Sequence, residues 1–413
     1  MARIRRVLLA VATLFAPALA QQSTQVLLSS DRNINMPQWQ SDWRKLTPDA
    51  PTAWSIRKYV LHGGKQEGVD VILLDNGKLI ISICPTRGMG ILWAKLGDVR
   101  LGWDSPIKEI VHPRNMNLQM RGGLGWLEGF NELVVRCGLE NTGQPGTDKF
   151  INNLGDEAAM ELTVHGKIAN IPASEVEVIV EKQPPYRLRV RGRVDERMFF
   201  GPKLELWTEV STEVGSDTLR ISDTLTNRGA SEQEFQILYH CNFGRPMLEE
   251  GSTFLAAVER IVPFNANAAK GITSYDQYAG PKAGFIEQVY WMYPLADSDG
   301  KSMAMLQNKA KDRAVSITFS PKELPYLTLW KNTTAEEEGY VTGIEPGSGF
   351  TANRRVERKA GRVPKLAGGA TRQFTLDFGI HVGSEAVRRA AARVREIQGS
   401  RKPLLEESPP KMQ

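Results

Sequence analysis

The sequence predicts an all-β protein, built as a large antiparallel β-sandwich with a short C-terminal helix. Two observations support this fold class. Short runs in which apolar and polar residues alternate recur at intervals of roughly ten residues, and turn-forming residues separate them. Helical periodicity, by contrast, is confined to one stretch near the C-terminus.

Residues 1–20 have the composition of a secretory signal peptide. Three arginines precede an apolar run, Val7–Ala20, that ends in Ala-Leu-Ala. The run is shorter than the ~20 residues that a membrane-spanning helix needs, and no second apolar stretch of that length follows. We therefore expect cleavage after Ala20, export to the periplasm or the extracellular space, and no stable insertion of the mature chain into a membrane.

The remainder divides into an N-terminal extension (residues 21–49), one sandwich domain (50–383), and a C-terminal helix with a disordered tail (384–413). No Ser/Gly-rich or Pro-rich linker interrupts the middle of the chain, and all-β sandwiches of this size commonly form one domain. Near its start, the sequence Asp75-Asn76-Gly77 between two apolar runs predicts a hairpin. A second hairpin is predicted around Pro184-Pro185, which interrupts a long alternating stretch.

The C-terminal helix is predicted from Ser384 onward. Ser384 is a suitable capping residue, and Glu385 follows it in the first turn. Beyond Gly399 the composition is typical of an unpacked tail.

The net charge argues against nucleic-acid binding. The chain carries a formal net charge of +5, and loss of the three leader arginines lowers it to +2. A nucleic-acid-binding domain normally has a much larger basic excess on one face.

The three cysteines, Cys84, Cys137 and Cys241, lie far apart in the sequence. An odd number leaves at least one thiol unpaired within the chain. Three buried thiols, or one disulfide and one free thiol, both agree with this pattern. No Cys-x-x-Cys or His-x-x-x-His spacing supports a metal site.

The sequence contains no nucleophile elbow, phosphate-binding loop, dinucleotide fingerprint or zinc-protease helix. Any chemistry must therefore come from dispersed residues that converge in a pocket. Two residues stand where an apolar strand gives way to a turn: His240 in EFQILYHCNFGRP and Glu345 in VTGIEPGSG. An imidazole with a pKa near 6.5 can exchange a proton at neutral pH. The other histidines are expected to be structural; they are His62, His112, His165 and His381.

At this point the sequence resembles the aldose 1-epimerase, or galactose mutarotase, superfamily. The order of TLRISDTLTNRG, ILYHCNFGRP, GYVTGIEPGSG and FTLDFGIHV carries the resemblance. The segments CPTRGMGILWAKLGDVRLGW, RGGLGWLEGFNELVVRCGLENTG and EQVYWMYPLADSDGK suggest a bacterial branch of that superfamily. The resemblance covers most of the mature chain, from about residue 69 to residue 382, and implies a galactose mutarotase-like supersandwich.

The resemblance also implies a reaction. A late Glu takes the proton of the anomeric hydroxyl of a bound sugar, and a His on a central strand protonates the ring oxygen. Glu345 and His240 match these two positions, and no metal or organic cofactor is implied. An acid and a base on opposite flanks of the ring would each contribute about 10²–10⁴ in rate, and burial would raise the pKa of Glu345 toward a useful range.

The expected substrate-binding residues follow from the same comparison. Members of the superfamily carry a second sugar-binding His on an earlier loop, where RCGLENTG offers Glu140 and Asn141 instead. Arginine forks suit hydroxyl pairs or carboxylates, tryptophan rings can stack on a sugar face, and Glu287 adjoins an aromatic cluster. The full set of expected binding residues is Arg87, Arg121, Trp126, Glu140, Asn141, Asn242, Glu287, Tyr290 and Trp330.

The basic run 354–365 is expected to be a solvated loop, although it could attract an acidic saccharide.

The leading hypothesis is an exported isomerase acting on the anomeric centre of a free sugar or sugar acid. A carbohydrate-binding protein without turnover, or a lyase or other sugar-active enzyme on the same sandwich, are the alternatives, because a fold does not fix a reaction.

Overall fold

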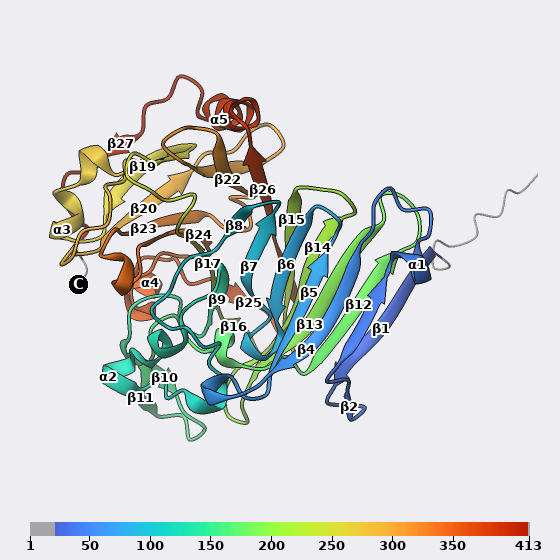
Figure 1. The fold of residues 1–413 in the computed structure, drawn as a ribbon. Helices are drawn as coiled ribbons and strands as arrows, with labels where there is room; N and C mark the ends of the chain where they lie inside the picture. The colour runs from blue at the N-terminus through green and yellow to red at the C-terminus, as the bar shows by residue number, and fades with distance from the viewer. Residues whose placement is uncertain (1–20, 412–413) are drawn as a thin grey trace, which may run out of the picture.

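The computed structural model describes residues 21–411, and two large sheets packed face to face make up most of them (Figure 1). This confirms the predicted all-β sandwich. Both sheets are antiparallel except where the short strand β27 joins the edge strand β19 in parallel. In the part of the chain that the structure describes, no helix is long and apolar enough to cross a membrane.

The first sheet has ten strands. In spatial order they are β18 (Thr253–Ala256), β21 (Ser302–Gln307), β22 (Arg313–Phe319), β26 (Thr371–Val382), β15 (Thr218–Asn227), β14 (Lys203–Glu213), β13 (Arg187–Arg197), β12 (Glu175–Glu181), β1 (Gln22–Ser29) and β2 (Ile34–Asn35).

The second sheet has thirteen strands and carries the candidate site. In spatial order they are β27 (Leu404–Leu405), β19 (Val258–Pro263), β20 (Gln288–Pro294), β23 (Tyr326–Asn332), β24 (Val341–Gly347), β17 (Gln236–Phe243), β9 (Val134–Leu139), β7 (Gly90–Leu96), β6 (Leu79–Cys84), β5 (Val69–Asp75), β4 (Ser55–Leu61) and β3 (Trp39–Asp42), with β8 (Val99–Leu101) paired to β7.

The remaining elements are short, apart from one helix. Two small ribbons are β10 (Gly146–Ile151) with β11 (Glu157–Leu162), and β16 (Gln233–Glu234) with β25 (Lys365–Leu366). The α-helices are α1 (Trp43–Leu46), α2 (Met120–Gly123), α3 (Ala266–Ala269), α4 (Arg354–Lys359) and α5 (Ser384–Gln398). The 3-10 turns are η2 (Gly64–Gln66), η3 (Pro85–Arg87), η4 (Pro113–Asn115), η5 (Gly125–Gly129), η6 (Ile168–Asn170), η7 (Ile272–Ser274) and η8 (Glu336–Glu338).

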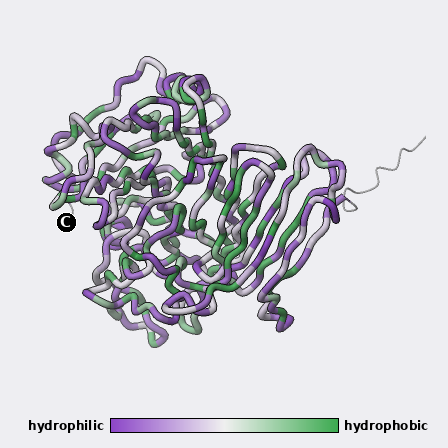
Figure 2. Tube along the Cα trace, in the orientation of Figure 1, coloured by the Kyte–Doolittle hydropathy of each residue, from purple (hydrophilic) through white to green (hydrophobic). Residues whose placement is uncertain are grey.

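The main hydrophobic core lies between the two sheets, and it decides which side chains can reach a ligand. Along β17, Ile237, Tyr239 and Cys241 belong to this core. Because successive side chains of a strand point to opposite faces, His240 and Asn242 lie on the face turned away from the other sheet. Figure 2 shows the hydrophobic stretches along the strands, with hydrophilic residues gathered over many of the loops.

The two predicted hairpins are present. Strands β5 and β6 are joined at Asn76-Gly77, where Gly77 adopts a φ of +90°, a conformation that glycine tolerates without strain. Strands β12 and β13 are joined around Pro184-Pro185. The C-terminal helix is also confirmed as α5, although Gly383 is its N-cap and Ser384 its first residue.

The chain ends differ from the expected domain boundaries. The N-terminal extension supplies β1, which pairs with β12, and β3, which pairs with β4, so it belongs to both sheets. The expected disordered tail supplies β27, and Glu406 forms an ion pair with Arg260 at 3.1 Å. The apolar pair Leu404–Leu405 extends the edge of the second sheet and thereby orders the tail. The expected leader, residues 1–20, lies outside the described residues.

The basic run 354–365 is not a solvated loop. It begins with helix α4, in which Arg354 pairs with Asp148 at 2.6 Å and Arg358 pairs with both Asp148 and Glu234 at 2.8 Å. These acids come from β10 and β16, which the sequence pattern did not place beside the run.

The three cysteines are all buried free thiols, so the disulfide alternative is excluded.

Candidate active site

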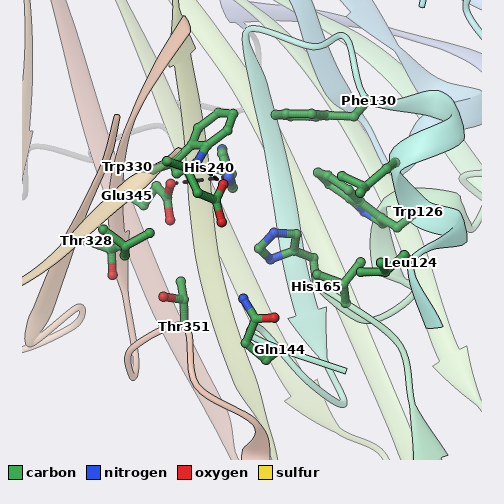
Figure 3. Close-up of a pocket in the computed structure, with 14 residues that line it drawn as sticks. Leu124, Trp126, Phe130, Gln144, His165, His240, Thr328, Trp330, Glu345 and Thr351 are labelled. Atoms are coloured by element: carbon green, nitrogen blue, oxygen red, sulfur yellow. Dashed lines mark hydrogen bonds and ion pairs between the residues drawn. The ribbon is translucent and has the colours of Figure 1, made fainter. Parts of the chain in front are cut away.

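A pocket of about 360 Å³ opens on the outer face of the second sheet (Figure 3). Strands β17, β23 and β24 form its floor, and the loops before β9 and around β10 and β11 form its walls. Its lining residues are Leu124, Trp126, Leu127, Phe130, Gln144, Val164, His165, His240, Glu287, Val289, Thr328, Trp330, Glu345 and Thr351.

His240 and Glu345 meet at the floor of this pocket. Strands β17 and β24 are neighbours, and the register that pairs Cys241 with Ile344 sets His240 beside Glu345. The imidazole Nε2 lies 3.2 Å from the carboxylate Oε1, and both side chains are at least 95% buried. The two residues are therefore in direct contact, which is closer than the expected arrangement with one group on each flank of a sugar ring.

The sequence leaves room for this contact at Gly343. It lies two residues before Glu345 on the same face of β24, and a Cβ there would stand 2.5 Å from Glu345 Oε1 and 3.2 Å from His240 Cε1. Any side chain would compete with the carboxylate for space.

Burial shifts the two pKa values in opposite directions. Desolvation, with a smaller contribution from the nearby Glu287 carboxylate, raises the pKa of Glu345 well above its usual value. Desolvation and the neighbouring His165 lower the pKa of His240 well below its usual value. Both shifts favour the uncharged forms of the two groups. At neutral pH, His240 Nε2 and Glu345 Oε1 therefore share one proton.

His165 lines the pocket, where the sequence analysis did not expect it. It follows β11 in a left-handed conformation, with φ +58°, and its Nδ1 lies 2.8 Å from the carbonyl oxygen of Thr142. Its ring centre lies 5.2 Å from that of His240 and 4.7 Å from that of Trp126. Burial lowers the pKa of His165 to about 4, which makes it a neutral hydrogen-bonding group.

A local signal for His165 was available in the sequence. It is followed by Gly166, which sits in a turn at φ +68°, and a Cβ on Gly166 would stand 2.4 Å from the carbonyl oxygen of Gly138. A His-Gly pair shortly after a strand therefore indicated a turn rather than a continuing strand, and the structure shows that this turn packs against β9.

Aromatic rings form one wall of the pocket. The Phe130 ring centre lies 4.7 Å from that of Trp126 and 6.0 Å from that of Trp330. Trp330 donates its indole N–H to Glu287 Oε2 at 2.7 Å. Trp126, Glu287 and Trp330 are thus found in the pocket where the sequence analysis expected them, and their roles in binding stay predictions.

Two polar atoms of lining residues, Trp126 Nε1 and Thr328 Oγ1, have no hydrogen-bond partner among residues 21–411. Buried polar atoms in folded proteins are nearly always satisfied. Their presence together around one cavity indicates a site that takes a polar ligand.

Both arginines expected in the pocket lie elsewhere. Arg87 is fully buried, 2.8 Å from Glu132 and 3.0 Å from the carbonyl oxygen of Val111, where it ties two loops together. Arg121 is exposed at a loop in a left-handed conformation, with φ +53°. Among residues 21–411, no lysine or arginine lines the pocket, whereas two carboxylates do.

Four other expected binding residues are also outside the lining. Glu140 pairs with Lys167 at 3.0 Å beside another cavity. Asn141 donates to the carbonyl oxygens of Gly143, Gln144 and Thr163 and thus shapes the wall loop. The hydroxyl of Tyr290 donates to the carbonyl oxygen of Ala268. Asn242 Oδ1 lies 2.7 Å from His240 Nδ1, the ring nitrogen that does not face Glu345.

The remaining polar lining residues, Gln144, Thr328 and Thr351, were not predicted. Uncharged polar side chains on strands and loops follow no motif, so nothing in the sequence distinguished them.

No group of three or more His, Cys, Asp or Glu side chains within the described residues is arranged to hold a metal ion.

The two-sheet sandwich with this pocket is of the galactose mutarotase-like class. The galactose mutarotase-like protein from Clostridium acetobutylicum shares the fold at 14% identity, with a TM-score of 0.53 over 79% of this chain and 98% of its own. Galactose 1-epimerase from Lactobacillus acidophilus NCFM shares it at 12% identity, with a TM-score of 0.51 over 79% and 99%.

The chain belongs to the family DUF4432, a domain of unknown function, whose model matches residues 66–380. A candidate aldose 1-epimerase from Klebsiella pneumoniae subsp. pneumoniae MGH 78578 is 42% identical, covers 94% of this chain and 99% of its own, and has a TM-score of 0.89. No protein with a curated description matches the chain.

Proposed function

We propose that this protein is an aldose 1-epimerase-like isomerase that interconverts the anomers of a neutral free sugar by acid–base ring opening. The contact between His240 Nε2 and Glu345 Oε1 at the floor of a sugar-sized pocket is the observation that carries the proposal. The relatedness to candidate and named aldose epimerases supports the same reaction class.

The direct contact between the two groups suits the chemistry of a hemiacetal. The anomeric hydroxyl oxygen and the ring oxygen are both bonded to the anomeric carbon, so one side of the sugar presents both. Two adjacent side chains can therefore serve both oxygens, and they need not flank the ring. One group removes the hydroxyl proton while the other protonates the ring oxygen, which breaks the ring C–O bond and forms a carbonyl.

Epimerisation follows from a turn in the open-chain sugar. Rotation about the bond next to the carbonyl exposes its other face to the ring hydroxyl. Reverse transfer of the two protons then closes the other anomer and restores the site. Acid and base catalysis are each expected to contribute about 10²–10⁴ in rate.

The lining favours a neutral sugar over a sugar acid. Two carboxylates, Glu287 and Glu345, border the pocket, and no lysine or arginine in the described part of the chain does. A sugar carboxylate would be repelled and would find no cationic partner there. The rings of Trp126, Phe130 and Trp330 offer flat apolar surfaces for the C–H face of a pyranose.

The test is anomer exchange measured by NMR above the spontaneous rate, on a panel of neutral hexoses, pentoses, deoxyhexoses and uronic acids. We expect the wild type to accelerate exchange of at least one neutral sugar and to act more slowly on uronic acids. The Glu345→Gln variant should lose about 10²–10⁴ in rate while it still binds the sugar. Glu259→Gln, which removes an exposed carboxylate instead, is the control and should keep full activity.

Unchanged exchange in the Glu345→Gln variant would reject the assigned chemistry. Sugar binding by the wild type without any exchange would instead identify a carbohydrate-binding protein.

A further inference from the structure

We propose that Asn242 is a positioning residue that fixes the tautomer of His240, so that Glu345 holds the shared proton in the resting site. The proton on His240 Nδ1 is inferred from hydrogen-bond geometry, and the directions of the two pKa shifts support the uncharged form of the pair. Its consequence for catalysis, that Glu345 acts first as the acid and His240 as the base, rests on the proposed function.

The orientation of the Asn242 amide is determined by its surroundings. Its Nδ2 lies 3.0 Å from the carbonyl oxygen of Glu132 and 3.2 Å from that of His240. Carbonyl oxygens only accept hydrogen bonds, and the amide nitrogen supplies two donors. A flipped amide would set its own oxygen against two acceptors in a buried site, so Oδ1 must point the other way.

The amide oxygen then determines where the imidazole carries its proton. Asn242 Oδ1 lies 2.7 Å from His240 Nδ1, and an amide oxygen can only accept. His240 must therefore donate from Nδ1. In a neutral imidazole the other nitrogen, Nε2, is then a bare acceptor.

The bare nitrogen faces Glu345. Nε2 and Oε1 are 3.2 Å apart, and an acceptor facing an ionised carboxylate would leave two lone pairs opposed. A proton on the Glu345 carboxyl removes this conflict by forming an O–H···N hydrogen bond. An imidazolium facing a carboxylate would fit the same distance, but the lowered pKa of His240 and the raised pKa of Glu345 favour the carboxylic acid with a neutral imidazole.

The groups around the pair favour this uncharged form. His165 faces His240 from the loop after β11, and the pKa shift of each of these two histidines is toward the neutral form. Glu287, near the start of β20, adds a negative charge that disfavours ionisation of Glu345. The nearby thiols Cys137 and Cys241 are buried with raised pKa values and are uncharged.

The proton transfers balance from this starting state. In ring opening, the Glu345 carboxyl protonates the ring oxygen as its bond to the anomeric carbon breaks. His240 Nε2 accepts the proton of the anomeric hydroxyl as the carbonyl forms, which leaves a carboxylate and an imidazolium. In closure, the imidazolium protonates the carbonyl oxygen, and the carboxylate removes the proton of the attacking hydroxyl. These roles are the reverse of those that the family resemblance implies for the opening step.

The decisive measurement is the ¹⁵N NMR of histidine-labelled protein at pH 7, with the His240 signals assigned from a His240→Gln variant. For the wild type we expect a protonated Nδ1 and a bare Nε2. In Asn242→Leu the constraint is lost, so the Nε2–H tautomer should become populated, and the exchange rate should fall by about 10- to 100-fold, by analogy with the loss of a hydrogen-bond partner of a metal-bound histidine. The fall should appear in kcat rather than in KM.

Asn227→Leu is a matched control. The Asn227 amide is also buried and donates to two backbone carbonyls, those of Ser231 and Leu366, but it lies at the end of β15 and makes no contact with His240. Loss of packing and hydrogen bonds alone would affect both variants, whereas a change of tautomer should occur only in Asn242→Leu.

A second variant separates positioning from structure. Asn242→Asp keeps an oxygen opposite Nδ1 but puts a second oxygen in place of the Nδ2 donor, facing the carbonyl oxygens of Glu132 and His240. A proton on that second oxygen restores a donor there, so His240 should keep its Nδ1–H. A wild-type signal from an Nε2–H tautomer or an imidazolium, an unaltered tautomer in Asn242→Leu, or loss of the Nδ1–H in Asn242→Asp would each overturn the proposal.

The two proposals fail separately. The tautomer is read without any sugar present, so an Nδ1–H tautomer in a protein that exchanges no sugar would reject only the proposed function. Sugar exchange by a protein whose His240 carries its proton on Nε2 would reject only the role of Asn242.

Discussion

At the scale of single residues, the lack of a side chain at Gly343 matters to the site as much as the side chains of His240 and Glu345. Gly343 occupies a β conformation that any residue could adopt, so its backbone does not require glycine. Its value lies in the space beside it, where the Glu345 carboxylate and the His240 ring come together. We therefore regard Gly343 as part of the site although it contributes no functional group.

A methyl group at this position gives a direct prediction. In Gly343→Ala the new Cβ would stand 2.5 Å from Glu345 Oε1, and the flexible carboxylate should rotate away with little cost to folding. Misplacement of a reacting group by about 1 Å can cost about 10² in rate, and we expect a loss of that size in sugar exchange with an almost unchanged melting temperature. Gly280→Ala, where the added Cβ meets only an ordinary contact at 3.4 Å, should leave both quantities unchanged.

At the scale of elements, a buried ion pair fixes the strands that carry the site. Arg136 on β9 pairs with Asp223 on β15 of the opposite sheet, with both side chains fully buried. Tyr239 on β17 donates to the same carboxylate at 2.8 Å. Because Tyr239 and His240 are consecutive on β17, a tyrosine held between the sheets leaves the histidine directed into the pocket.

Removing the tyrosine hydroxyl tests this link. Tyr239→Phe keeps the ring but deprives the Asp223 carboxylate of a donor, so the free energy of unfolding should fall by about 1.5–3 kcal/mol, the range for hydrogen bonds to charged groups. Tyr290→Phe is the matched variant, because this buried hydroxyl donates to uncharged acceptors, Ala268 O and Gln288 Oε1. We expect a smaller loss of about 0.5–1.5 kcal/mol there. Urea unfolding of both variants measures the difference, and equal losses would contradict a role for the charged acceptor.

At the scale of the whole molecule, the first strand of the fold begins almost directly after the expected signal peptide. Strand β1 begins at Gln22, and the carbonyl oxygen of Gln21 accepts a hydrogen bond from Lys182. Cleavage after Ala20 would thus release a chain whose first residues are already part of a sheet. Export itself is proposed on the composition of residues 1–20.

Fractionation of cells that produce the full chain tests the proposal. We expect mature protein in the periplasmic or extracellular fraction, with a mass that corresponds to an N-terminus at Gln21. Replacement of the three leader arginines by glutamate should retain the protein in the cytoplasm. Full-length protein that stays in the cytoplasm without this change would contradict export.

The site itself shows where sequence reasoning succeeded and where it failed. His240 and Glu345 were found because each follows an apolar run, which is a local feature, although β17 continues to Phe243 and β24 to Gly347, so both residues lie inside their strands. Arg87 was placed in the pocket wrongly, because its burial against Glu132 depends on a loop from another part of the chain. His165 was not expected in the pocket, because it reaches the pocket through a turn that packs against β9.

Local patterns were sufficient to determine the all-β class, the hairpin at Asn76-Gly77, the C-terminal helix and two candidate proton-transfer residues, because alternation and turn chemistry act between near neighbours in the chain. Only the tertiary structure decided that His240 and Glu345 touch, that Asn242 contacts His240 Nδ1, and that no lysine or arginine of residues 21–411 lines the pocket. Those facts depend on which strands become neighbours in the sheet, and β17 and β24 are brought together by packing rather than by sequence proximity. The same packing excludes water from the pair, and desolvation then sets where its proton resides.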